Sequence, residues 1–295
     1  MSSMHRFQQD LISRHEGIIR RQFLAQLGLT ATAVLGIAHC GCRQTPITNR
    51  RQLTLVPETQ EQQMGLTAFE DIRKKNTLST NKSYVEIVQR VGQRLAAVSQ
   101  REDYKWEFAV IADKTQNAFC LPGGKVAFYE GIIPVCANEA GVAVVMSHEI
   151  SHALARHGGE RMSQQMVEEK VGTGGIALAK YTGVKMTADQ EKLALNAYNV
   201  GAEYGVMLPF SRFHETEADE MGIHLMAKAG YDPSEAPKFW QRFSGAKKGG
   251  PQTPWYASTH PSDETREENL AKILPEALHE YEGAATKYGV GVAVS

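Results

Sequence analysis

Two histidines and a glutamate within residues 145–152 have the types and the spacing that suit metal-dependent hydrolysis. The segment reads VMSHEISH, with His148 and His152 four residues apart and Glu149 between them. On a helix, residues four apart lie on one face, so both imidazoles can reach the same ion. This arrangement suits Zn²⁺, and the glutamate can act as a general base on an activated water molecule. Such a short pattern also arises by chance in on the order of one in a hundred chains, so it needs support from other residues.

The surrounding sequence favours elements that would position this motif. Residues 140–155 contain no Pro and a single Gly, and their apolar side chains recur at helical spacing. An amphipathic helix is predicted over residues 83–98, a strand over residues 106–111, and further helix over residues 162–205. A Pro-Gly-Gly turn at residues 122–124 predicts a hairpin or a sharply bent strand. The expected fold class is α+β, mainly α with a small β-sheet.

The acidic stretch 211–222 offers the further ligand that a zinc hydrolase needs. Catalytic zinc is typically held by three protein ligands and keeps one open position. Glu215 and Asp219 are four residues apart, so they share a helix face. Glu215 is the predicted third ligand, and Asp219 is expected to orient a metal-bound histidine through its other ring nitrogen. Glu217 lies on another face and is a poorer ligand; a solvated acidic helix face is the alternative for the whole stretch.

His157 follows the motif closely but fits poorly as a ligand. It lies five residues after His152, which is about 500° further around a helix and away from the side of the motif. We expect its ring to lie at the surface or behind the metal ligands.

The first 42 residues have the pattern of an export signal. Arg20 and Arg21 precede an apolar run over residues 23–38 that is too short for a membrane-spanning helix. The paired arginines resemble a twin-arginine signal of bacteria, with an ordinary secretory signal as the alternative. Cys42, which follows a Gly, is a candidate for lipidation, and an anchor without lipid is the alternative. Either interpretation predicts a bacterial periplasmic protein anchored to a membrane.

Composition and the remaining sequence divide the chain further. Residues 43–60 are polar with two prolines and are predicted to be a linker, followed by a single domain over 61–275 and a tail over 276–295. The 32 basic and 33 acidic residues give a net charge of −1, which does not favour a nucleic-acid partner. Cys120 and Cys136 are expected to be buried free thiols, although a disulfide is the alternative in an oxidising compartment.

The motifs together resemble the membrane-associated gluzincins of peptidase family M48, in particular a periplasmic branch without multiple membrane spans. The resemblance covers residues 60–275. It is carried by the His-Glu-x-x-His motif and by four further segments, residues 117–124, 211–222, 227–233 and 258–266.

This resemblance implies roles that the residues alone do not establish. In the family, the strand before the metal helix is an edge strand that pairs with an extended substrate; here it would comprise Asn117, Ala118, Phe119 and Cys120. A Ser-Thr-His-Pro loop would place His260 over the metal, where it could occupy the fourth position and switch the enzyme between closed and open forms. Arg266 would support this loop or stabilise the oxyanion, and His260 is a second candidate for that role.

The expected function is zinc-dependent endopeptidase activity with one Zn²⁺ per chain and Glu149 as general base. The expected substrates are polypeptides, in particular misfolded or membrane-associated envelope and outer-membrane proteins. One alternative is a non-proteolytic zinc-dependent chaperone or scaffold for such proteins, and another is a zinc amidase acting on cell-wall peptides.

Overall fold

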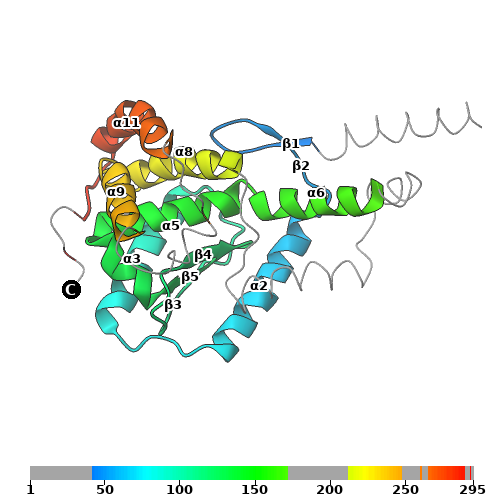
Figure 1. Ribbon diagram of the computed structural model, residues 1–295, viewed down its shortest axis with the longest axis horizontal. Coiled ribbons are helices and arrows are strands. Elements are labelled where there is room, and N and C mark those ends of the chain that lie inside the picture. The colour runs from blue at the N-terminus through cyan, green and yellow to red at the C-terminus, as the bar shows by residue number, and fades with distance from the viewer. Residues whose placement is uncertain (1–41, 172–211, 248–259, 261–264, 290–292, 294–295) are drawn as a thin grey trace, which may run out of the picture.

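A small mixed sheet with helices on both faces forms the scaffold of the protein (Figure 1). The structure is a computed structural model that describes residues 42–171, 212–247, 260, 265–289 and 293. The sheet contains β3 (Glu107–Ile111), β4 (Ala118–Leu121) and β5 (Lys125–Tyr129) in the order β3-β5-β4. The described helices are α2 (Glu58–Lys75), α3 (Lys82–Val98), α4 (Ile133–Cys136), α5 (Glu139–Leu154), α6 (His157–Val171), α8 (Arg212–Lys228), α9 (Glu235–Lys247) and α11 (Thr265–Gly283), with a 3₁₀ turn η1 (Glu130–Ile132). The predicted α+β class is confirmed.

The sheet places β4 at an edge among the described strands. β5 pairs in parallel with β3 and antiparallel with β4, where Ala118 lies opposite Phe128. Gly123 and Gly124 form the turn of this hairpin with φ of 81° and 79°, a region that favours glycine. A Cβ atom on Gly124 would also lie 2.7 Å from the Trp106 ring. The predicted strand and hairpin are therefore confirmed, and the edge position follows from the strand order.

Both faces of the sheet are covered, which explains why every residue of β4 is buried. Cys120 belongs to the main core with α3 and α5, whereas Phe119 and Leu121 pack with Phe69 of α2. Successive side chains in a strand point to opposite faces, so a strand with helices on both sides contains apolar residues throughout.

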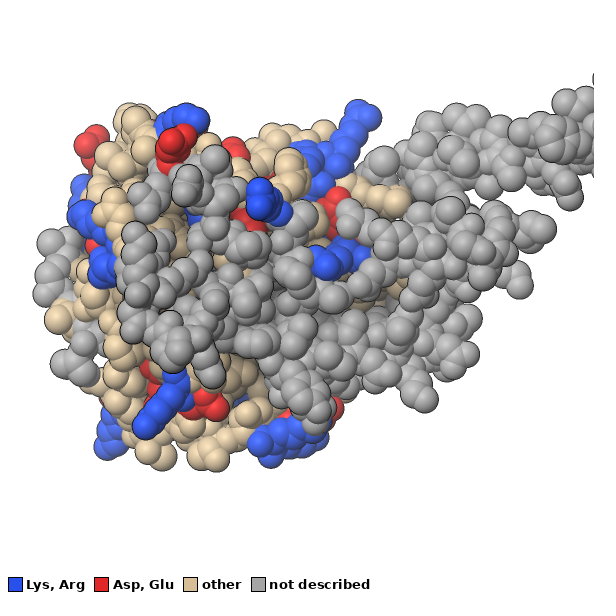
Figure 2. All heavy atoms as spheres, viewed as in Figure 1, with Lys and Arg blue, Asp and Glu red and all other residues tan. Residues whose placement is uncertain are grey.

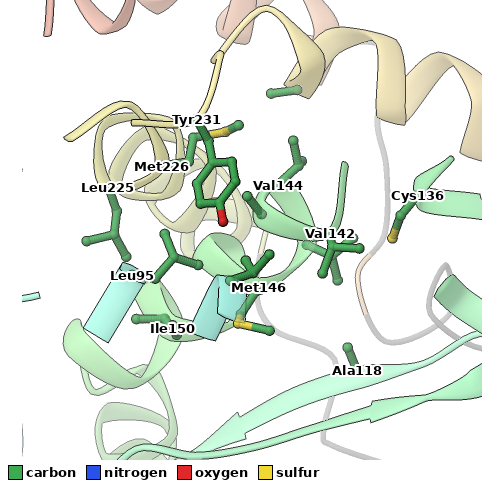
Figure 3. Packing of buried hydrophobic residues seen from close by; sticks show 14 of the residues in the cluster. Leu95, Ala118, Cys136, Val142, Val144, Met146, Ile150, Leu225, Met226 and Tyr231 are labelled. Carbon is green, nitrogen blue, oxygen red and sulfur yellow. The ribbon is translucent and has the colours of Figure 1, made fainter. Parts of the chain in front are cut away.

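The helix that carries the metal motif, α5, lies at the centre of the core. It begins at Glu139 and is capped by Asn138, whose side chain accepts a hydrogen bond from the backbone N–H of Gly141 at 2.8 Å. All of its residues are buried. Figure 3 shows its apolar side chains packed among residues from neighbouring elements, namely Leu95, Ala118, Leu225, Met226 and Tyr231.

The acidic stretch lies on α8, which packs directly against α5. α8 packs against α5 on one side and α11 on the other, and α9 contacts both α5 and α11 (Figure 1). A Cβ atom on Gly222 of α8 would lie only 3.1 Å from the backbone nitrogen of His148. This glycine therefore marks a close approach of the two helix backbones, and the approach brings α8 side chains within reach of α5.

The predicted linker over residues 43–60 is wrong as a description of this segment. It contains the antiparallel pair β1 (Cys42–Gln44) and β2 (Arg51–Leu53) and the start of α2. Thr45 is 1% exposed and donates a hydrogen bond to Glu217, which is distant in sequence. Thr45 and Arg50, two of the polar residues that suggested a linker, thus bind a buried carboxylate of the protein.

The predicted boundary at residue 275 also differs from the structure, because Pro275 lies inside α11. Beyond that helix, the Tyr288 ring stacks against the Arg94 guanidinium, whose Cζ lies 3.6 Å from the ring centroid. The predicted export signal up to residue 41, residues 172–205 of the predicted 162–205 helix and most of the 258–266 loop lie outside the described residues. In the described part of the chain, no helix combines the length and apolar character that crossing a membrane requires.

Acidic and basic side chains are interspersed over the described part of the face in Figure 2.

A glycine pair tests the packing of α2 on the sheet. A Cβ atom on Gly65 would lie 2.2 Å from the carbonyl oxygen of Pro122, whereas one on Gly283 would have no neighbour within 4 Å. We expect Gly65→Ala to lower the free energy of unfolding by about 1–3 kcal/mol, because α2 must move away from the hairpin turn. Gly283→Ala should leave it unchanged or raise it by less than about 1 kcal/mol. Urea unfolding of both variants makes the comparison, and equal stabilities would contradict the packing.

Candidate metal centre

Four side chains from three parts of the chain converge on one buried point. They are His148, His152, Glu215 and His260, whose ligand atoms all lie within 4.8 Å of one another. The Nε2 atoms of His148 and His152 are 3.1 Å apart, and the Glu215 carboxylate lies 3.4 Å and 3.5 Å from them. Nδ1 of His260 lies 3.1 Å from the Glu215 oxygens. No member of this cluster is more than 3% exposed.

The helices account for this convergence. His148 and His152 are one turn apart on α5, and Glu215 reaches them from the first turn of α8. His260 comes from the segment that precedes α11. The structure therefore brings together the three sequence-predicted metal ligands and the histidine whose position only the family resemblance implied.

The chemistry of these donors fits zinc. Two imidazoles and a carboxylate are a ligand set used by catalytic zinc sites. Burial opposes ionisation of Glu215, but His260, His148 and His152 outweigh it and hold the pKa of Glu215 well below its usual range. Glu215 is therefore an ionised carboxylate, as a metal ligand must be.

Asp219 and Arg266 lie directly behind His148. Oδ1 of Asp219 is 2.9 Å from Nδ1 of His148, while Nε2 of that ring faces Glu215. Arg266 donates to both oxygens of Asp219, at 2.7 Å for one of them, and its Nη1 lies 3.4 Å from Glu215. Burial opposes ionisation of Asp219, but Arg266 and His148 together lower its pKa. The structure thus places Asp219 against Nδ1 of His148 and Arg266 against the two carboxylates.

Glu149 lies beside the convergence point and next to the sheet. It is 1% exposed, and its Oε1 is 3.5 Å from Nε2 of His260. Burial, together with the nearby Glu149 carboxylate, raises the pKa of the Cys120 thiol on β4 well above its usual value. Cys120 and Cys136 are both free and buried, as expected from the sequence.

The surface interpretation of His157 is wrong, whereas a place behind the ligands agrees with the structure. α5 ends at Leu154 and Arg156 has a φ of 54°, so the chain leaves the helix before α6 begins at His157. Extrapolating helical rotation to His157 therefore failed. Its ring is fully buried with Nδ1 at 2.8 Å from Nδ1 of His152, and burial lowers its pKa to about 4.

Sequence reasoning missed Trp240, which closes the site from α9. Its ring centroid is 6.0 Å from that of His148, and the Arg266 guanidinium stacks on its ring at 3.5 Å. A tryptophan in an ordinary amphipathic helix carries no local signal for this position, because its role depends on how α9 packs against α5.

A buried His-Glu-x-x-His helix with a glutamate from a second helix defines the site of a zinc metallopeptidase of the gluzincin type. The model of "Peptidase family M48" matches residues 84–274, and the chain belongs to this family. The family and the relatives of the chain confirm the expected class, zinc metalloendopeptidase, and zinc is the metal of this family.

Individual relatives come from mitochondria and from bacteria. The chain is 37% identical over 235 residues to mitochondrial metalloendopeptidase OMA1 of Schizosaccharomyces pombe, covering 79% of this chain and 66% of that protein. It is 39% identical over 184 residues to OMA1 of Saccharomyces cerevisiae, covering 60% and 50%. It is 29% identical over 212 residues to the beta-barrel assembly-enhancing protease of Escherichia coli, covering 70% and 42%. The chain therefore spans between 42% and 66% of the length of these relatives.

These matches contradict the expected location in a bacterial periplasm. Five relatives at 27–39% identity are mitochondrial OMA1 proteins of fungi, a plant and vertebrates. The expectation rested on the first 42 residues, whose basic and apolar pattern is shared by several kinds of targeting segment. The prediction of a periplasmic location is therefore wrong.

Removal of the predicted third ligand should lower zinc affinity. We expect Glu215→Ala to weaken zinc binding by more than about 100-fold, beyond the 10–100-fold typical of groups that only orient a ligand. Glu220→Ala, on the same helix but half-buried outside the cluster, is the matched control. Competition with a chromogenic chelator measures both affinities. An affinity of the Glu215 variant equal to that of the control would exclude Glu215 as a ligand.

Proposed function

We propose that this chain is a zinc-dependent endopeptidase that hydrolyses internal peptide bonds of misfolded or membrane-associated proteins. The observation that carries the proposal is the buried convergence of His148, His152 and Glu215 next to Glu149 and the edge strand β4. A zinc site that served only structure would have no need for an additional buried carboxylate beside its ligands.

The residues divide the work of hydrolysis. His148, His152 and Glu215 would hold the zinc, which supplies Lewis-acid activation of water and of the scissile carbonyl. Glu149 would accept the proton of the attacking water and deliver it to the nitrogen of the leaving amine. Asp219 would keep the proton of His148 on Nδ1, so that the Nε2 lone pair points to the metal.

The substrate would bind along β4 in extended conformation. β4 pairs only with β5 among the described strands, so its other edge is not paired within that sheet. Main-chain groups of residues Asn117, Ala118, Phe119 and Cys120 would then add the substrate as a further strand. Cys120 shares the face of α5 and lies near Glu149, which supports this register beside the general base.

Arg266 would act mainly by holding carboxylates. Its contacts with Asp219 and Glu215 and its stacking on Trp240 fix the guanidinium behind the ligands. These contacts favour a positioning role over direct stabilisation of the oxyanion.

His260 would control access to the open metal position. Its Nδ1 lies within hydrogen-bond distance of Glu215 and 3.3 Å from Nε2 of His148, so the ring occupies the centre of the cluster. In this arrangement the ring would take the position that the attacking water needs. Cleavage would require the segment before α11 to move His260 aside.

Attachment to a membrane through the N-terminal segment is part of this proposal, because it would hold the enzyme near membrane-associated substrates.

The general base can be tested without disturbing the metal. We expect Glu149→Gln to lower casein cleavage by about 10²–10⁴-fold, because the amide cannot accept the proton. Zinc content should equal that of the wild type. Glu102→Gln, an exposed substitution of the same kind, is the control. Equal cleavage by the wild type and Glu149→Gln would refute the peptidase mechanism. Absence of cleavage by both would support a closed gate if His260→Ala cleaves casein, and the chaperone or scaffold alternative if it does not.

The proposed gate predicts an activating substitution. His260→Ala should raise kcat/KM for casein several-fold and lower zinc affinity, because one ring that occupies the site is removed. Cleavage assays at saturating zinc and chelator competition provide the two measurements. A fall in kcat with unchanged zinc affinity would instead indicate that His260 stabilises the oxyanion.

A further inference from the structure

A chain of hydrogen bonds leads away from the zinc site on the side of His152. Nδ1 of His152 lies 2.8 Å from Nδ1 of His157, and Nε2 of His157 lies 2.9 Å from Oε2 of Glu217. All three side chains are at most 3% exposed. The Glu217 carboxylate in turn contacts the hairpin of β1 and β2, more than 160 residues earlier in the chain.

The hairpin surrounds this carboxylate with donors. Arg50 donates from Nε to Oε2 of Glu217 at 2.9 Å, and the Thr45 hydroxyl donates to Oε1 at the same distance. The Thr48 hydroxyl also donates to Oε1. Together with His157, four donors reach the two oxygens of Glu217, so this side chain acts as an acceptor throughout.

One arrangement of protons satisfies the whole chain. Because Glu217 accepts, His157 carries its proton on Nε2 and presents the Nδ1 lone pair to His152. His152 must then donate from Nδ1, which leaves the lone pair of its Nε2 directed at Glu215 and His148. This is the tautomer that a zinc ligand bound through Nε2 requires.

Arg50 also fixes the hairpin to α6. Its Nη1 and Nη2 atoms donate to the two oxygens of Glu160 at 2.9 Å and 2.7 Å. The same Glu160 lies 3.1 Å from Nε2 of His214, whose ring stacks on His157 with 4.3 Å between centroids. A single guanidinium thereby ties α6 and α8 together around His157, and such bidentate pairs with arginine have a well-defined geometry.

We propose that the hairpin of β1 and β2 is part of the zinc site, with Arg50, Glu217 and His157 as positioning residues for His152. Each zinc histidine then has its own carboxylate on α8: Asp219 contacts His148 directly, and Glu217 reaches His152 through His157. The inference rests on the zinc-binding part of the proposed function and is independent of peptide cleavage.

Zinc affinity is the measurement that tests this inference. Arg50→Ala and His157→Phe should each weaken zinc binding by about 10–100-fold in chelator competition, as is typical when the partner of a metal-bound histidine is lost. The Phe substitution keeps a ring against His214, which limits the damage to packing. Arg51→Ala, an exposed change in the same hairpin, is the matched control and should bind zinc like the wild type.

A double variant shows whether the residues act as one chain. If Arg50 acts through His157, Arg50→Ala should cost no further affinity in the His157→Phe background. The absorption spectrum of the Co²⁺-loaded protein should change alike in both single variants, because the ligand geometry changes at His152. Circular dichroism of the metal-free variants confirms that each one is folded before its affinity is compared.

Three results would overturn the proposal. They are zinc affinities within two-fold of the wild type in folded variants, additive losses in the double variant, and an unfolding midpoint that falls equally with and without zinc. The last result would describe a hairpin that only stabilises the fold. If the wild type and His260→Ala both bind zinc and both fail to cleave casein, while the Arg50 and His157 variants still lose affinity, the peptidase proposal fails and this one stands.

Discussion

The need to satisfy many ionisable groups inside the core governs this structure. Four potential ligands and Glu149 are almost completely buried, and a buried charge or imidazole is costly unless it has partners. The protein meets this requirement with paired groups, Arg266 on Asp219 and Glu215 on one side and Arg50 on Glu217 on the other. The hairpin of β1 and β2, together with α9 and α11, supplies these partners around the contact between α5 and α8.

The first turns of α8 concentrate three different roles in five residues. Glu215 faces the metal position, Glu217 faces the hairpin and His157, and Asp219 faces His148. Successive residues on a helix differ by about 100°, so alternate positions on a buried helix contact different neighbours. A helix that is surrounded by protein can therefore use all three carboxylates, whereas a surface helix would expose at least one.

The site and the location of the protein are separate matters. The relatives include mitochondrial OMA1 proteins and bacterial beta-barrel assembly-enhancing proteases, and the family model covers residues 84–274, which contain the residues of the zinc site. Zinc chemistry depends on a few buried side chains. A targeting segment depends only on general basic and apolar character, which signals for different compartments share. The motif that defined the chemistry therefore contained no information about location, and an expectation built on the N-terminal pattern was wrong.

Local spacing in the sequence determined the metal helix, the sheet and the pair of Glu215 and Asp219, because helix and strand periods fix which side chains share a face. Only the tertiary structure decided what lies behind the ligands. The sequence suggested that His157 lies either at the surface or behind the ligands. The structure decided for the second position, because the helix ends before His157, as the φ of 54° at Arg156 shows. It also suggested a solvated linker around Arg50, although that guanidinium binds carboxylates of α6 and α8. A polar side chain has the same local signature whether its partner is water or a distant carboxylate, so the packing of the hairpin had to decide between them.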